Sequence, residues 1–428
     1  MEPTRSSKVS AVKTSDVLIA GGGMVGLTLA LALAQGGVSV SVADPVPPSV
    51  LTNSAFDGRV TALSYAAVRM LKVLGVWEYV ATEAQPISDI LVTDAALGSP
   101  PSALSLHFDH REIGEPMGAI AENRHIRRAL FAALEGTGVR LIAPAAVTAI
   151  EPNGGFIDAT LSNGERLRAH LAVGADGRES PLRERMGLRT VAWSYPQVGI
   201  VATVQHERPH NGTAYEHFLS SGPFAILPMV AASHSEAVGQ YPTNRSSLVW
   251  TEREELAPAL LELPPELFAA EVERRFGDHL GAIEVVGARW SYPLRFHLAR
   301  GYVAPRFALA GDSAHGIHPI AGQGLNLGLK DAAALAECVL ESVRLGLDAG
   351  DAEALRRYER WRRFDSFVLA AATDGLNRLF SNDIAPVRAI RDVGLGIVDA
   401  IGPLRRLFMR NAGGDLGQLP RLMRGEPA

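Results

Sequence analysis

The chain has 428 residues, of which 47% are hydrophobic and 20% are charged, and its formal net charge at pH 7 is −5. This composition excludes a disordered, collagen-like or low-complexity protein, and the charge does not favour a nucleic-acid partner. The single cysteine, Cys338, excludes an internal disulfide framework and a cysteine-based zinc site. Because no signal-peptide pattern is present either, we expect the protein in the reducing cytoplasm.

The N-terminal segment reads as a βαβ unit. Residues 16–20 and 38–43 are β-branched runs typical of strands, and residues 27–34 form a helical run between them. The whole stretch 17–43 is apolar, but its glycines and its change of period argue against a membrane span. A parallel sheet covered by helices is therefore expected.

The turn inside this unit has the sequence Gly21-Gly22-Gly23-Met24-Val25-Gly26, in which Gly21, Gly23 and Gly26 fit G-x-G-x-x-G. Glycines at this spacing permit a tight turn, close approach of a pyrophosphate and close packing of helix on strand. Asp44 ends the second strand, where a carboxylate binds an adenosine ribose. The pattern predicts a dinucleotide site.

Further elements follow in chain order. Apolar residues at helical or alternating spacing predict helices over 66–80, 123–136 and 264–276 and strands over 141–150, 156–161 and 166–173. Short β-like segments between 198 and 292 predict an antiparallel sheet inserted into the first domain. A strand over 307–310, a long helix over 324–345 and a mostly helical region over 351–412 complete the chain.

Residues 307–337 indicate which dinucleotide binds. A strand ends at Gly311-Asp312, where a carboxylate can accept a hydrogen bond from a sugar-alcohol hydroxyl. Gly322 and Gly324 then let the backbone approach a flat ring, and the next helix points its positive N-terminal end there. Such an end stabilises negative charge on a reduced flavin, so the segment favours FAD. A third element, residues 171–187, again places a carboxylate, Asp176, after a strand.

These three motifs, in this order, resemble the flavoprotein aromatic hydroxylases of the para-hydroxybenzoate hydroxylase type. The segments FDGRVTALS (56–64), YPL (292–294), HPIAGQGLNLGLKDAAALAE (318–337) and TDGLNRLF (373–380) resemble, more closely, the ubiquinone-biosynthesis hydroxylases. The similarity extends from about residue 15 to about residue 410. Many members of that family carry Glu where this chain has Asp44, which keeps the carboxylate.

The resemblance implies roles for individual residues. Asp312 should bind the FAD ribitol or pyrophosphate, Asp176 should support the flavin and nicotinamide encounter, and Arg59 and Arg124 should lie beside the flavin and pyrophosphate. For the two arginines a helix cap or a surface ion pair is the alternative. The expected cofactor-binding set is Gly21, Gly23, Met24, Val25, Gly26, Asp44, Arg59, Arg124, Asp176, Gly311, Asp312, Gly322, Gly324, Leu325 and Asn326.

The resemblance also implies the reaction. NAD(P)H would reduce FAD, and a flavin C4a-hydroperoxide formed with O2 would hydroxylate the ring of a polyprenylated phenol in ubiquinone biosynthesis. No catalytic side chain is required, because the flavin performs the chemistry. Pro319, Gly322, Gln323 and Gly324 would line the flavin and substrate side. The alternatives are an FAD-dependent prenyl-lipid reductase, an aromatic hydroxylase of secondary metabolism and a non-enzymatic flavin-binding assembly component.

The expected fold class is α/β, with a Rossmann-like FAD-binding domain, an inserted and mainly antiparallel β-sheet substrate domain and a helical C-terminal region. The expected bounds are 14–84, 112–186 and 297–345 for the first, 85–111 and 187–296 for the second and 346–428 for the third.

The remaining candidates are histidines and the C-terminus. His315 and His318 are predicted to be structural hydrogen-bonding residues, and His206 and His210 to be solvated, with no metal site. Residues 403–412 place apolar residues on one helical face and arginines elsewhere. This helix is expected to pack on the body or to dock on a membrane surface or on other quinone-biosynthesis proteins, which would make the protein peripheral at the inner face of the membrane.

Overall fold

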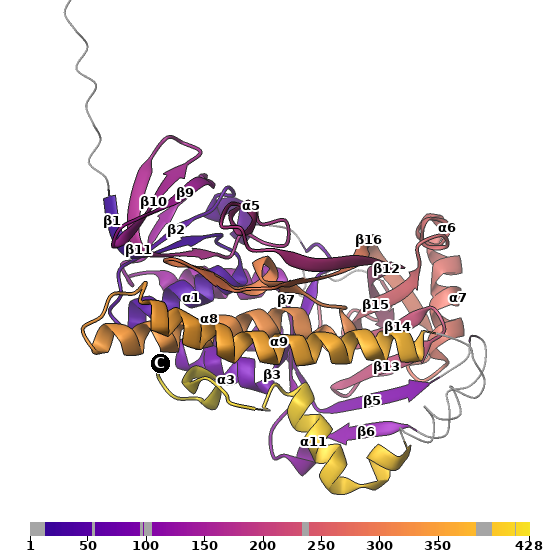
Figure 1. Cartoon of the computed structure of the whole chain (residues 1–428). Coiled ribbons are helices and arrows are strands. Elements are labelled where there is room, and N and C mark those ends of the chain that lie inside the picture. Colours follow the sequence, from indigo (N-terminus) through magenta and orange to yellow (C-terminus); the bar gives the residue numbers. More distant parts are fainter. Residues whose placement is uncertain are drawn as a thin grey trace, which may run out of the picture.

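The computed structural model describes residues 13–53, 56–94, 97, 105–232, 239–381, 396–415 and 417–428. In these residues two large sheets lie side by side along two long helices, α8 (Gln323–Arg344) and α9 (Ala352–Phe380) (Figure 1). The α/β class, with a Rossmann-like domain, a mainly antiparallel sheet and a helical C-terminal region, is confirmed. The domain bounds given above stay a prediction.

The first sheet has the strand order β17-β18-β11-β1-β2-β8, with β10 paired to β11 and β9 paired to β10. Its strands are β1 (Lys13–Ala20), β2 (Val40–Ala43), β8 (Arg140–Ile142), β9 (Val147–Asn153), β10 (Phe156–Leu161), β11 (Arg166–Gly174), β17 (Val303–Ala304) and β18 (Phe307–Leu309). Strands β8, β2, β1, β11 and β18 run parallel. The carboxyl ends of β1, β11 and β18, which carry the three motifs, therefore meet at one edge.

Helix α1 (Met24–Gln35) connects β1 to β2 and packs against α8 and α4 (Asn123–Leu134). Its residues from Gly26 to Leu33 are all buried, which explains why this segment is almost uniformly apolar. The shorter helices of the N-terminal half are α2 (Pro48–Thr52), α3 (Tyr65–Val73) and α5 (Pro181–Arg185). Cys338 is buried in α8.

The second sheet has the order β19-β16-β12-β15-β14-β13-β5-β6. Its strands are β5 (Asp89–Asp94), β6 (Leu106–Asp109), β12 (Thr190–His206), β13 (Thr213–Leu219), β14 (Gly222–Met229), β15 (Arg245–Arg253), β16 (Ile283–Ala299) and β19 (His315–Gly316). All neighbouring strands are antiparallel except β13 and β5. Helices α6 (Ala257–Glu262) and α7 (Pro265–Phe276) cover one face, where Phe268 and Phe276 pack in one core with Trp250.

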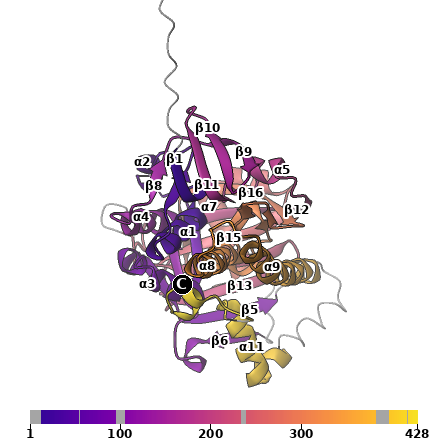
Figure 2. The ribbon, with the colours of Figure 1, turned by 60° about the vertical axis from the view of Figure 1, so that its left-hand side comes forward.

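A small sheet of β3 (Val60–Ser64), β7 (Gly118–Glu122) and β4 (Ala84–Ile87) and the C-terminal helices complete the fold. Figure 2 shows α8 and α9 nearly end-on and side by side, and the two helices are in contact. Helix α11 (Gly402–Ala412) lies near β5 and β6 (Figure 1). Among the described helices, none combines the length and apolarity needed to cross a bilayer.

Two expectations about elements are wrong. The single strand expected over 141–150 is two strands, β8 and β9, because Pro144 between them has no N–H to donate to a ladder. The helix expected over 66–80 ends at Val73 and is followed by Gly75, whose φ of 71° is outside the helical range. In the described part of the chain, the other expected strands and helices are present with shifts at their ends. Residues 382–395 of the expected helical region 351–412 lie outside the described residues.

Candidate cofactor and substrate site

The three glycines of the first motif differ in how closely other atoms approach them. A Cβ atom added at Gly21 would lie 2.2 Å from the Ala175 carbonyl oxygen, and one added at Gly26 would lie 2.0 Å from the Gly21 carbonyl oxygen. By contrast, no atom lies within 4 Å of a Cβ added at Gly23, which is exposed at the N-cap of α1. Gly21 and Gly26 therefore permit close packing, whereas Gly23 leaves open space for a ligand.

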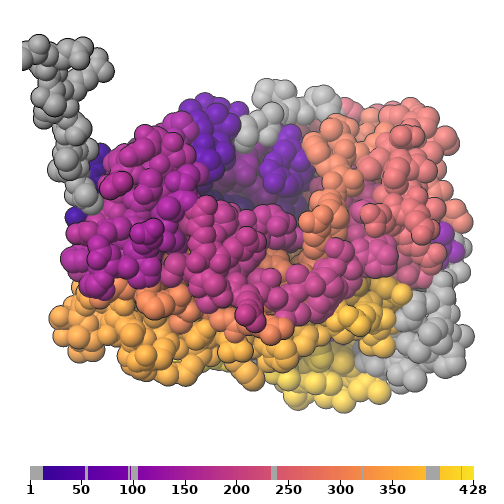
Figure 3. Space-filling model, turned by 45° about the horizontal axis from the view of Figure 1, so that its top comes forward, coloured from indigo at the N-terminus to yellow at the C-terminus, as the bar shows by residue number. Residues whose placement is uncertain are grey.

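The N-terminus of α1 has no side chain capping it, so its N–H groups face this open space. The sequence prediction of a pyrophosphate cradle fits this geometry, since a helix N-terminus attracts an anion and Gly23 lets the anion approach. Figure 3 shows a hollow on one face of the molecule, with the indigo N-terminal residues as its floor and magenta and orange segments at its border.

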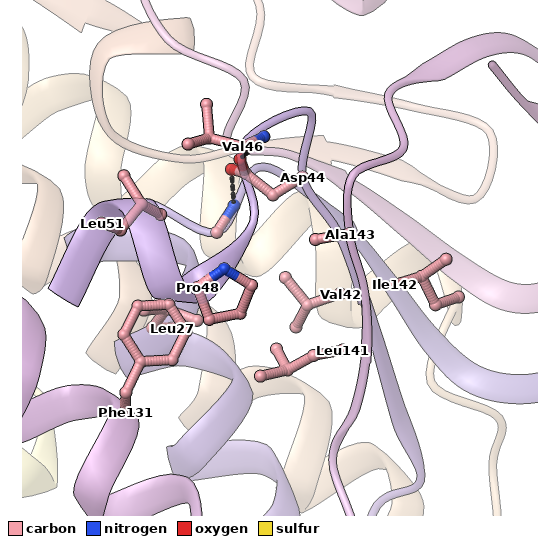
Figure 4. A pocket seen from close by; sticks show the side chains of 11 residues that line it. Leu27, Val42, Asp44, Val46, Pro48, Leu51, Phe131, Leu141, Ile142 and Ala143 are labelled. Carbon is pink, nitrogen blue, oxygen red and sulfur yellow. Dashed lines mark hydrogen bonds between the residues drawn. The ribbon is translucent and has the colours of Figure 1, made fainter. Parts of the chain in front are cut away.

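Asp44 lies beside the same turn. Its Oδ2 accepts a hydrogen bond from the Gly22 backbone N–H at 2.6 Å, and its Oδ1 accepts one from Val46 N–H at 2.7 Å. Figure 4 shows Asp44 at the edge of a small pocket whose other walls are apolar, among them Leu27, Pro48 and Phe131. A carboxylate fixed by backbone donors next to an apolar pocket fits the ribose and adenine end of FAD.

The second motif begins where β18 ends. Gly311 has a φ of 68°, and a Cβ atom added there would lie 3.1 Å from the side chain of Val25. Asp312 is exposed, so its carboxylate is accessible to a sugar hydroxyl. Met24 and Val25 are partly buried in the first turn of α1. The glycine turn and the 311–324 loop thus lie against each other.

The loop continues into α8 through Gly322, which has a φ of 63° and is an N-cap without a capping side chain. No atom lies within 4 Å of a Cβ added at Gly324. The Asn326 side chain ties this helix end to β3, because its amide donates to the Ala62 carbonyl at 2.8 Å and its oxygen accepts from Ser64 N–H at 3.0 Å. A second uncapped helix N-terminus, held in place from β3, fits the ring end of FAD.

A buried network, missed by the sequence analysis, holds the 311–324 loop from behind. Asp331 of α8 and Arg362 of α9 both have 0% exposure, and Arg362 Nε donates to Asp331 Oδ1 at 2.7 Å. The Asp331 Oδ2 atom accepts from Gly311 N–H at 2.9 Å and lies 2.5 Å from His315 Nε2. Burial opposes ionisation of Asp331, but the charges of His315 and Arg362 hold the pKa of its carboxyl below the ordinary value.

The basic residues expected near the cofactor lie in two different settings. Arg59 is exposed, and its Nε donates to Asp57 at 2.8 Å. Arg124 is buried and pairs with Glu122 at 2.7 Å, and Arg245 reaches the same carboxylate at 3.2 Å. The pair of Arg59 is the surface ion pair considered as its alternative, whereas the pair of Arg124 is buried and is not a surface ion pair. The cofactor contacts of both arginines stay a prediction.

Asp176 lies just beyond the end of β11, as expected, but both of its carboxylate oxygens are buried. Burial raises the pKa of this carboxyl. Its encounter with flavin and nicotinamide stays a prediction.

The predictions for the four histidines have different outcomes. His315 is a structural hydrogen-bonding residue, as predicted. His318 is buried, but neither of its ring nitrogens has a hydrogen-bond partner among the described residues. The prediction that His206 and His210 are solvated is wrong: His206 is fully buried and bonds Arg208 O and Ser246 Oγ, and His210 bonds Met229 O at 3.0 Å. The physical reason for His206 is that it is the last residue of β12 and lies within the sheet, whereas His210 follows the strand and is partly buried. In the described part of the chain, no cluster of three or more metal-ligating side chains occurs.

A cavity of about 660 Å³ lies on the other side of the loop. It is enclosed by β3, one face of the second sheet, α9 and α11, and it is lined mostly by aliphatic and aromatic side chains. Six residues of the loop segment line it: Pro319, Ile320, Gly322, Gln323, Leu325 and Asn326. Gly324 is not among its lining residues. The loop therefore separates the glycine turn from an apolar space large enough for a substituted aromatic ring.

Comparison with known proteins agrees with this geometry. A family model described as FAD binding domain matches residues 14–365. The chain is 51% identical to the ubiquinone hydroxylase UbiL of Rhodospirillum rubrum, over 98% of this chain and 94% of that protein. It is 33% identical to the 3-demethoxyubiquinol 3-hydroxylase of Escherichia coli, over 93% of this chain and 98% of that protein.

Solved structures with the same fold include p-nitrophenol 4-monooxygenase PnpA of Pseudomonas putida, at a TM-score of 0.74 and 18% identity, which covers 95% of this chain and 100% of that one. The probable FAD-dependent monooxygenase pqsL of Pseudomonas aeruginosa matches at a TM-score of 0.71 and 21% identity, over 90% of this chain and 99% of that one.

The open space at Gly23 gives a test of the pyrophosphate cradle. Because a Cβ atom at Gly23 meets nothing in the protein, Gly23→Ala should change the free energy of unfolding of the apoprotein by less than about 0.5 kcal/mol. The same methyl group would stand where the anion approaches, so FAD affinity, measured by flavin fluorescence titration, should fall by about tenfold or more, or about 1.4 kcal/mol. Gly21→Ala is the comparison: its φ of 111° and its close contact should lower apoprotein stability as well. Equal FAD affinity in Gly23→Ala and the native protein would contradict this model.

The Asp331 network gives a second test. Arg362→Met leaves the Asp331 carboxylate buried without its guanidinium partner, which should cost about 3–5 kcal/mol in urea unfolding. Arg356→Met on the same helix is the matched control, because its pair with Glu353 is exposed and should change stability by less than about 1 kcal/mol. Similar losses in both variants would mean that the network does not hold the loop.

Proposed function

Because this chain belongs to the family of FAD-dependent hydroxylases of ubiquinone biosynthesis, we propose that it hydroxylates the aromatic ring of a polyprenylated phenol, with NAD(P)H as reductant and O2 as co-substrate. The observation that carries the choice of substrate is the apolar cavity of about 660 Å³, which is lined by the same 319–326 segment that begins α8 beside the FAD site. A small polar substrate would not need such a lining.

The chemistry divides between cofactor and protein. When bound, FAD supplies hydride acceptance from NAD(P)H and activation of O2 for transfer of an electrophilic hydroxyl group to the ring. The residues of the chain bind and orient. The N–H groups of α1 and the open face at Gly23 would hold the pyrophosphate, and the uncapped N-terminus of α8 would stabilise negative charge at the flavin ring.

The cavity walls supply the second part of the protein's contribution. Side chains such as Phe218, Leu227 and Phe380 would exclude water from the ring, which protects the reactive oxygen species from discharge as H2O2. Pro319 and Ile320 would position the ring against the flavin loop. Because orientation within the cavity selects the ring carbon, positional specificity would come from these walls.

The polyprenyl tail would leave the cavity beside the C-terminal helices. Phe408 of α11 lines the cavity and is 44% exposed, and the neighbouring Leu407 and Ile401 are about half exposed without lining it. On α9, Phe364 is 70% exposed and Phe367 is 58% exposed. Arg406 and Arg410 are exposed on α11 beside these apolar groups. Apolar and basic side chains on one helix favour contact with an anionic bilayer surface, where a prenylated substrate dissolves.

The prenyl-lipid reductase and the secondary-metabolism hydroxylase are less well supported. The relatives reported above are named for ubiquinone hydroxylation, and identity to the first reaches 51% over nearly the whole chain. A reductase would consume NAD(P)H without O2, so isotope incorporation separates the two reactions.

The proposed reaction is tested with purified holoprotein, NAD(P)H, a short-chain prenylated phenol and 18O2. The product should gain one 18O atom on the ring, and O2 uptake should match product formation. Ala225→Phe places a ring inside the cavity and should lower product formed per NAD(P)H by about 10²-fold, with FAD content unchanged. Val191→Phe, at an exposed position of the same sheet, is the control. A product without 18O would refute the hydroxylation.

The membrane contact is tested by co-sedimentation with vesicles of phosphatidylcholine and an anionic phospholipid. Each basic residue near such a surface contributes about 1 kcal/mol, so the double variant Arg406→Glu/Arg410→Glu should bind at least about tenfold more weakly. Arg166→Glu, exposed on β11, is the control and should bind as the native protein does. No difference between the two variants would contradict docking through α11.

A further inference from the structure

Glu216 is the only carboxylate among the described residues that line the cavity. It lies in the middle of β13, where Ala214, Glu216 and Phe218 occupy alternate positions of one face. Its neighbours on the adjacent strands are Val92 of β5 and Ala225 of β14, both of which also line the cavity. An ionisable side chain therefore stands at a position of the sheet that is otherwise apolar.

The Glu216 carboxylate makes no hydrogen bond or ion pair with another residue in the described part of the chain. A partly buried carboxylate without a partner costs free energy, and packing of β13 gives no reason for it. Burial raises the pKa of this carboxyl from 4.5 to about 7. Its charge therefore changes near neutral pH, and its remaining accessible surface faces the cavity.

Glu216 also lies close to the 311–324 loop. Phe218, two residues along β13, packs in one apolar cluster with Ile320 of the loop and Phe380 of α9, and the rings of Phe218 and Phe380 are 4.1 Å apart. Two residues of a strand span about 7 Å, which is close to the width of a substituted phenol ring. A phenol ring held against the loop beside Phe218 would therefore reach the Glu216 carboxylate with its hydroxyl group.

We propose that Glu216 accepts the proton of the substrate's phenolic hydroxyl, a role that rests on the proposed hydroxylation. The proton moves from the phenol oxygen to a carboxylate oxygen, and the phenolate gains electron density at its ortho and para carbons, where an electrophilic hydroxyl group is transferred. The substituted carbon then loses its hydrogen as a proton, which ends in the water released. Glu216 returns its own proton to the ring oxygen, so it is regenerated in each turnover.

Among the described residues that line the cavity, no other side chain titrates near pH 7. The elements around β13 contribute uncharged lining residues, among them Val92 of β5, Ala225 of β14, Thr251 of β15, Thr373 of α9, Gln323 of the loop segment and Asn411 of α11. The two phenols in the lining, Tyr215 and Tyr292, have pKa values that burial raises above 10, so they stay neutral. A free phenol also ionises near 10, so it needs a base to react as phenolate at neutral pH.

The test is Glu216→Gln in the holoenzyme, because glutamine keeps the shape of the side chain and cannot accept the proton in this way. Product formed from a short-chain prenylated phenol should fall about 10²-fold or more, and H2O2 released per NAD(P)H should rise. The rate of hydroxylation by the native enzyme should increase as pH rises through about 7, because the carboxylate forms, and the variant should show no such increase. Thr251→Val, which changes an uncharged group in the same cavity, should show the same increase in rate with pH as the native enzyme.

A binding measurement gives a readout that does not depend on turnover. Because the phenol donates a hydrogen bond to the carboxylate, the affinity of the native protein for a short-chain prenylated phenol should increase as pH rises through about 7, and the affinity of Glu216→Gln should stay constant over this range. Thermal stability gives a further readout. Because the pKa of the Glu216 carboxyl in the folded protein exceeds 4.5, ionisation of this group lowers the stability of the native protein as pH rises from 4.5 through about 7. The Tm of Glu216→Gln should therefore exceed that of the native protein by an amount that increases over this pH range.

The outcomes are distinguishable. If the native enzyme incorporates 18O and Glu216→Gln does so at the same rate with the same pH profile, the role of Glu216 is overturned and the hydroxylase stands. A variant that has a lower Tm and loses FAD would show a structural role and would also overturn it. If the native enzyme incorporates no 18O, the proposed function itself fails.

Discussion

The position of the 311–324 loop depends on one buried carboxylate. Asp331 receives the Gly311 N–H, the His315 ring and the Arg362 guanidinium, so the 311–315 segment and α9 converge on the two carboxylate oxygens of one α8 residue. Without solvent at this point, each donor is held strongly, because a missing partner would leave a buried charge uncompensated. The carboxyl end of β18, the start of the loop and the C-terminal helix α9 are thereby fixed to α8.

This arrangement connects the two halves of the site. The loop held by Asp331 faces the glycine turn on one side and the apolar cavity on the other. Helix α9, which supplies Arg362, also lines the cavity with Thr373 and Phe380 farther along its length. One helix therefore sets the position of both the 311–324 loop and a wall of the cavity. Such an arrangement would keep the distance between a flavin and an aromatic ring constant.

The parts of the site that were predictable from sequence are those made by short segments. The glycine turn, Asp44 and the Gly311-Asp312 exit depend on neighbours within a few residues, so motif spacing is sufficient to find them. Asp331 and Arg362 meet only through packing of α8 on α9, although a single aspartate before an alanine run was a signal of a buried charge. Glu216 was hidden for a similar reason: its place between Ala214 and Phe218 on one strand face reveals a carboxylate in an apolar layer once the strand is known. His206 was predicted to be solvated because the length of β12 is not encoded locally.

The burial of Cys338 has a consequence for an enzyme that handles oxygen. Cys338 is a buried residue of α8, and burial raises the pKa of its thiol to about 12. Peroxides attack the thiolate and not the thiol, so the fraction of reactive sulfur at neutral pH is negligible. Uncoupled turnover would therefore leave this side chain unoxidised, and methionines would be the first residues to record such damage.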